Sequence, residues 1–169
     1  MILVEADVSE EWDSSTDWAQ LAGAAVRAAV AQSGMPGLLE SGLAAEVSVR
    51  FTSDQEVKAL NSAWRGKDKA TNVLSFPMVE PGHLQSLART ESGEALLGDI
   101  VLAQGICASE AAEKGLESCT HAAHLVVHGA LHLLGYDHER GDEEAETMED
   151  AERRSLAALG IADPYEIHR

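Results

Sequence analysis

The sequence predicts an α+β domain with one small mixed β-sheet, and three observations support this class. The 169 residues are enough for one domain with a sizeable core, and apolar residues make up 45% of them. Short β-rich segments alternate with longer segments of helical periodicity, in the order β-α-β-α-β-β-α-α-α. Aromatic residues make up only 4%, so Ala, Val, Leu and Ile must form most of the core. We therefore treat residues 1–169 as a single domain.

The first third of the chain carries clear local signals. Residues 2–8 are rich in β-branched side chains and short, which indicates a strand. Residues 17–32 are rich in Ala at helical spacing, and Asp17 can cap their start. Residues 45–52 alternate between apolar and polar side chains, as in a half-buried strand. A capping box at the start of residues 53–64 predicts the next helix.

The middle of the chain is dominated by strands and loops. Residues 65–69 form a polar loop that contains Gly, and residues 72–76 form a strand that Pro77 stops. Residues 80–95 are polar and contain Pro and Gly, so we expect a loop. Residues 96–103 are apolar and predict a further strand.

The last third is predicted to be helical. Residues 104–114 form one helix, and residues 119–134 form the most apolar helix of the chain, which Gly135 ends. Residues 142–159 form a final helix with an acidic face and an apolar face.

The charge of the chain argues against a polyanionic partner. Lys and Arg total 12 against 29 Asp and Glu, a net charge of −17. Most of the excess lies in residues 5–17, with six acids and no base, and in residues 139–155, with eight acids and three bases. The total predicts weak, salt-sensitive affinity for RNA, so an RNA substrate is expected to arrive on a ribosome or with a protein partner.

The cysteines and the N-terminus indicate an intracellular protein. Cys107 and Cys119 form no C-x-x-C pair, and two cysteines are too few for a secreted disulfide scaffold, so we expect reduced thiols. Residues 1–7 become acidic at once, unlike a signal peptide. No apolar run of about 18 residues is present, so we expect no membrane partner and a cytoplasmic location.

A histidine cluster lies in the apolar segment 119–134. His128 and His132 are four residues apart, so on a helix they share one face and can bind one metal ion. A buried imidazole costs free energy unless it is hydrogen-bonded or ligated. Gly135 lets the chain turn back, which brings His138 within reach of the same ion. Three histidine ligands leave one position open for water, as in catalytic zinc sites.

Two ordinary, hydrogen-bonded histidines on a helix remain the alternative to a metal site. We interpret His124 as a core residue or a support for the ligands, and we expect His121 at the surface. Asp137 is either a carboxylate that orients a ligand or water, or part of a turn. Gly129 stands where the H-E-x-x-H zinc proteases have Glu, so a peptidase of that type lacks its general base.

A short basic stretch precedes the third strand. Residues 56–69 hold four basic and two acidic residues, a local charge of +2. Arg65 stands at a helix end before Gly66, where its guanidinium can hold a phosphate through two hydrogen bonds. We expect Lys67 and Lys69 to contact the same substrate, and an ordinary solvated loop is the alternative.

Three motifs together are recognisable. The run from His128 to His138, His-Gly-x-Leu-His-x-x-Gly-Tyr-Asp-His, closely resembles the signature of the bacterial YbeY-type rRNA maturation factors, which are single-strand-specific metallo-endoribonucleases. Residues 60–76 resemble a second motif of that family, and residues 98–100, Gly-Asp-Ile, resemble a third. The motifs stand in the family's order, and the resemblance spans the chain from about residue 45. One departure is Ala70, where the family often has Pro.

The resemblance implies a zincin-like α+β fold with one zinc ion held by His128, His132 and His138. It implies that Arg65 is a functional residue of an RNA site, and we take Arg65 and His128 as catalytic. It also implies a role in maturing the 3′ end of 16S rRNA and in ribosome quality control, with single-stranded rRNA and the ribosome as partners.

Two other functions remain open at this point. One is a metal hydrolase of another substrate class, such as a peptidase. The other is a protein without catalytic activity, in which zinc is structural and the acidic surface binds the ribosome, basic ribosomal proteins or an assembly GTPase.

Overall fold

The computed structural model describes residues 1–137 and 141–165. Its strands are β1 (Ile2–Val8), β2 (Ala44–Thr52), β3 (Val73–Pro77) and β4 (Glu94–Ala103). Its helices are α1 (Trp18–Gln32), α2 (Asp54–Arg65), α3 (Pro81–Ala88), α4 (Gln104–Lys114), α5 (Ser118–Leu133) and α6 (Asp142–Ala158), with a short 3-10 helix at Pro36–Leu39.

The four strands form one mixed sheet in the order β1-β2-β4-β3. β1 pairs with β2 and β2 with β4 in parallel, whereas β3 pairs with β4 in the antiparallel sense. This sheet confirms the predicted α+β class, and the zincin-like interpretation is consistent with it. No helix of the described chain combines the length and apolar character needed to cross a bilayer.

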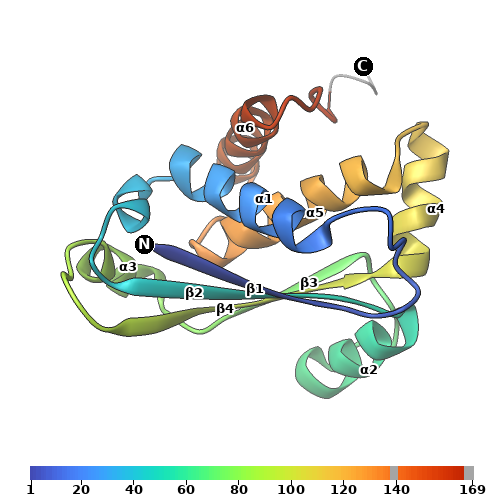
Figure 1. The fold of residues 1–169 in the computed structure, drawn as a ribbon, viewed down its shortest axis with the longest axis horizontal. Coiled ribbons are helices and arrows are strands. Elements are labelled where there is room, and N and C mark those ends of the chain that lie inside the picture. The colour runs from blue at the N-terminus through green and yellow to red at the C-terminus, as the bar shows by residue number, and fades with distance from the viewer. Residues whose placement is uncertain (138–140, 166–169) are drawn as a thin grey trace.

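The helices lie in two unequal layers on the sheet (Figure 1). Helices α1 and α5 cover one face, where inward side chains of β2 and β4 such as Val49, Phe51 and Ile100 join the main core, and α6 packs on these two helices. Helix α2 lies on the opposite face, where Val57 packs in a smaller core with Val101 of β4. The last four residues of β4, from Ile100 to Ala103, are therefore buried on both faces, which explains why this part of the strand is continuously apolar.

Two glycines let α5, β3 and β4 approach one another closely. Gly98 has φ +152°, and a Cβ there would lie 2.4 Å from the carbonyl oxygen of Phe76. A Cβ on Gly129 would lie 2.9 Å from Cγ2 of Ile100. These contacts place α5 directly on the sheet beside β3 and set the distance between the sheet and the histidines of α5.

Most predicted elements are present, and one prediction is wrong. Asp17 caps α1 by accepting from the backbone N–H of Gln20, and Ser53 caps α2 by accepting from that of Glu56. Residues 80–95, predicted as a loop, contain helix α3 and the start of β4. Pro81 stands in the first turn of α3, where a residue without an N–H costs the helix nothing.

Candidate active site

The predicted metal ligands His128 and His132 lie one turn apart on α5. This helix packs against β3 and β4 on one side and against α1 and α6 on the other. The Nε2 atoms of the two histidines are 3.1 Å apart. Two nitrogen ligands at about 2.0–2.1 Å from a tetrahedral ion would be separated by about 3.3 Å. The spacing and chemistry of this pair therefore suit two ligands of one metal ion.

A buried carboxylate on α6 orients the pair. Glu152 is 1% exposed, and its Oε1 accepts from Nδ1 of His128 at 2.8 Å. Its Oε2 accepts from Nε2 of His124 at 2.7 Å and from the hydroxyl of Tyr165 at 2.6 Å. Burial raises the pKa of Glu152, but the hydrogen bonds from His124 and His128 outweigh it and hold this pKa well below its usual range.

The charge of Glu152 decides which imidazole nitrogen is available. An ionised carboxylate only accepts, so His128 donates from Nδ1 and, when neutral, presents an Nε2 lone pair. Burial and the neighbouring Glu152 raise the pKa of Tyr165, which keeps its hydroxyl a donor. His124, interpreted as a support for the ligands, shares the carboxylate with His128.

The basic residues come from the end of α2 and the loop that follows. Gly66 ends the helix with φ +68°, and the backbone N–H of Lys67 donates to the carbonyl of Asn61 at 3.2 Å. Nδ2 of Asn61, a residue 1% exposed, donates to the carbonyl of Lys69 at 2.9 Å. Asn61 thus fixes the loop that carries Lys67 and Lys69. None of the ion pairs between described residues involves these lysines or Arg65.

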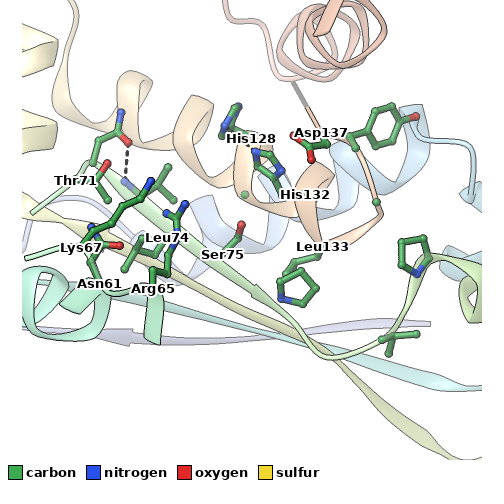
Figure 2. A pocket seen from close by; sticks show the side chains of 18 of the residues that line it. Asn61, Arg65, Lys67, Thr71, Leu74, Ser75, His128, His132, Leu133 and Asp137 are labelled. Atoms are coloured by element: carbon green, nitrogen blue, oxygen red, sulfur yellow. Dashed lines mark hydrogen bonds between the residues drawn. The ribbon is translucent and has the colours of Figure 1, made fainter. Parts of the chain in front are cut away.

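One cavity joins the two groups of residues. It has a volume of about 720 Å³, and Arg65, Lys67 and Lys69 line it together with His128 and His132. In Figure 2, Arg65 and Lys67 stand on the α2 side, the two imidazoles stand on the α5 side, and Ser75 of β3 lies between them. The structure thus brings together cationic and imidazole groups that are at least 59 residues apart in the sequence.

The remaining predicted residues lie beside the imidazoles. Asp137 lines the cavity next to His132 (Figure 2). His138, the predicted third ligand, lies outside the described residues. Within residues 1–137 and 141–165, no three His, Cys, Asp or Glu side chains form a group that could hold a metal ion.

A second polar network supports the wall of the cavity. Glu110 of α4 accepts a hydrogen bond from Nδ2 of Asn72 at 3.1 Å, and its carboxylate lies within hydrogen-bond distance, 2.8 Å, of Nε2 of His121. The prediction that His121 is at the surface is wrong, because this residue is 1% exposed. It lies on α5 where α4 packs against that helix. Its Nε2 meets Glu110, whereas its buried Nδ1 has no hydrogen-bond partner among the described residues. Burial lowers the pKa of His121, and this effect outweighs the hydrogen bond to Glu110.

Glu152 is the residue that the sequence analysis missed. A signal for it exists, because Glu152 falls on the same helical face as the apolar residues Met148, Ala151 and Leu156, all of them buried. A carboxylate on the buried face of an amphipathic helix needs partners. Two of those partners are His124 and His128 of α5.

Comparison with known proteins identifies the family. A family model described as Endoribonuclease YbeY matches residues 6–160 of this chain. The chain belongs to the YbeY endoribonuclease family. The resemblance carried by the motifs is therefore confirmed, and the match also covers most of the first 45 residues, where the motifs gave no information.

Similar members of the YbeY family cover almost the whole chain. A protein named endoribonuclease YbeY from Rhizorhabdus wittichii is 54% identical over 167 residues, which are 99% of this chain and 98% of that protein. Another from Sphingopyxis alaskensis is 52% identical over 165 residues, 98% of each protein. The solution structure of TM1509 from Thermotoga maritima shares the fold, with a TM-score of 0.54, 24% identity and coverage of 96% of this chain and 98% of that one.

Proposed function

We propose that this protein is a zinc-dependent endoribonuclease that cleaves single-stranded RNA. The observation that carries the proposal is the cavity in which the two paired imidazoles of α5 face Arg65 and the lysines of the α2 loop. Membership of a family whose relatives are named endoribonuclease YbeY supports the same activity.

Zinc would be held by His128, His132 and His138. The described part of this set fits the ion, since two nitrogen donors converge at 3.1 Å and a buried carboxylate fixes the tautomer of one of them. When bound, zinc supplies a water of pKa about 7 and acts as a Lewis acid. His128 acts in catalysis as a ligand that Glu152 holds in position.

The cationic residues act on the phosphodiester. The guanidinium of Arg65 binds the phosphate through two hydrogen bonds and stabilises the charge that builds on its oxygens in the transition state. Lys67 and Lys69 contact neighbouring phosphates and counter the repulsion that a chain of net charge −17 exerts on RNA. The cavity lies between α5, β3 and the α2 loop, and we propose that the RNA enters it as an unpaired strand.

In the cell, we propose, the enzyme matures the 3′ end of 16S rRNA and acts in ribosome quality control. Its basic patch is small, and the first turn of α6 carries Asp142, Glu143 and Glu144, all exposed. Such an acidic surface suits basic ribosomal proteins or an assembly GTPase, which would deliver RNA that the enzyme binds weakly by itself.

The test uses four purified proteins: wild type, His132→Ala, Arg65→Ala and Lys58→Ala. Each is assayed for bound zinc and for cleavage of one RNA sequence in single- and double-stranded form. We expect His132→Ala to lose zinc and cleavage together. Arg65→Ala should keep zinc and lose cleavage by about 10²- to 10³-fold, the cost of removing one donor to a developing oxyanion.

Lys58→Ala is the matched control, because Lys58 is exposed on α2 and does not line the cavity. Its cleavage should equal that of wild type, which would show that the Arg65→Ala loss does not come merely from removing one positive charge of α2. Full activity in Arg65→Ala would remove this residue from the site. Zinc loss that unfolds the protein, with no RNA cleavage by wild type, would instead indicate a structural metal.

A further inference from the structure

Trp64 differs from the other two tryptophans of the chain. Trp12 and Trp18 are 5% and 4% exposed and pack against Phe51 in the core. Trp64, in the last turn of α2, is 74% exposed. Among the described residues it has no recorded contact with another ring or with a cation. Leaving so large an apolar side chain in water gives up the free energy of burying it, about 1.5–3 kcal/mol for a large apolar residue.

The helix places Trp64 on the same side as the cavity. Val57, Asn61 and Trp64 recur at spacings of four and three, so they share one face of α2. Val57 and Asn61 are 0% and 1% exposed, whereas Trp64 continues this face one turn further and is largely exposed. Asn61 and its next neighbour on the helix surface, Arg65, both line the cavity. Trp64 does not line the cavity itself, but it shares a helix face with Asn61 and directly precedes Arg65, so the helix places it beside the cavity.

The charges around Trp64 select the kind of ligand. Arg65, Lys67 and Lys69 follow it directly in the chain, and no ion pair between described residues neutralises them. An exposed aromatic ring beside phosphate-binding cations is the arrangement with which proteins bind single-stranded nucleic acid, because bases stack on the ring while the cations follow the backbone. A basic protein partner would be repelled by the same cations.

We propose that Trp64 is a stacking site for an unpaired nucleobase next to the phosphate that Arg65 binds. This inference rests on the proposed function, since it names a further contact of the same RNA strand. The indole accepts any base, because every base has a π face. In a duplex both faces of each base are covered by its neighbours, so the site favours single strands.

Binding is measured with single-stranded oligonucleotides that carry 2′-O-methyl groups and with matched oligonucleotides that lack the bases. Trp64→Ala should weaken binding of the base-containing strand and raise KM for single-stranded RNA by about 5- to 150-fold, the range that alanine substitution gives for one stacked base. Binding of the abasic strand, kcat and zinc content should stay unchanged. Trp64→Phe should retain most of the affinity.

The fluorescence of wild type provides a direct signal. Trp12 and Trp18 are buried, so quenching on addition of the oligonucleotide should come from Trp64 and vanish in Trp64→Phe. Equal binding by Trp64→Ala and wild type, or an equal loss on the abasic strand, would overturn the stacking site while RNA cleavage by wild type kept the proposed function. If Trp64→Ala cleaved RNA normally but lost binding to a ribosomal protein, the site would be a protein contact and the inference would be wrong.

Discussion

Replacing Glu152 with Gln should weaken metal binding without changing the shape of the core. The carboxylate accepts three hydrogen bonds, from His128, His124 and Tyr165, at 2.6–2.8 Å. An amide of the same size accepts through one oxygen only, so its NH₂ group must face at least one of these donors. If the NH₂ faces His128, the imidazole proton moves to Nε2 and removes the lone pair that would bind metal.

The expected loss is about 10- to 100-fold in zinc affinity, the usual effect of removing a group that orients a metal-bound histidine. This corresponds to about 1.4–2.7 kcal/mol. The assay is a competition for zinc between the protein and a chromophoric chelator. Glu146→Gln serves as the control, because Glu146 is an exposed acid on the same helix and makes the same change in charge.

Two results would refute the reasoning about Glu152. One is a zinc affinity in Glu152→Gln equal to that of Glu146→Gln and wild type. The other is an unchanged tautomer of His128 in ¹⁵N NMR spectra of the variant's imidazoles. Either would show that Glu152 serves packing alone.

Three further outcomes follow from the structure. Gly98→Ala should lose about 1–3 kcal/mol of unfolding free energy in urea, because a Cβ at φ +152° would meet a carbonyl oxygen of β3. Gly82→Ala, which has open space around it, should lose none, and equal stability of the two variants would contradict this. Burial raises the pKa of the Cys107 thiol to about 12, so a thiol reagent at neutral pH should label the partly exposed Cys119 first and Cys107 only on unfolding; rapid labelling of both in the folded protein would contradict it. The lowered pKa of His121 contributes stability that is fully present above pH 6.5 and is lost as the pH falls through the pKa of the folded protein. Wild type should therefore lose unfolding free energy more steeply than His121→Gln just below pH 6.5. Parallel curves of unfolding free energy against pH would count against the buried neutral imidazole.

The fold was predictable where a signal is local. The caps at Asp17 and Ser53 fix the starts of two helices through hydrogen bonds between residues three apart, so both partners can be identified in the sequence. Helix α3 was missed because Pro81 and Gly82 indicate a turn equally well. The order of the strands depends on pairings between distant segments, such as β1 with β2, which no local pattern specifies.

The site, too, was predictable only where its residues are close together in the sequence. His128 and His132 are four residues apart on one helix, so their proximity follows from helical geometry alone. Glu152 stands 24 residues beyond His128 and reaches it only because α6 packs on α5. The sequence shows that Glu152 is on a buried face, but the identity of its partner depends on tertiary packing. His121 was misplaced for a similar reason, since its partner Glu110 belongs to another helix.

A zinc titration of metal-free protein tests most directly whether cleavage of single-stranded RNA depends on a zinc ion held by the histidines of α5. The protein is stripped with a chelator, and cleavage of a single-stranded RNA is measured as zinc is added back. We predict no cleavage without metal, full activity at one equivalent of zinc, and no recovery in His132→Ala. Cleavage at the full rate by metal-free wild type would contradict the account.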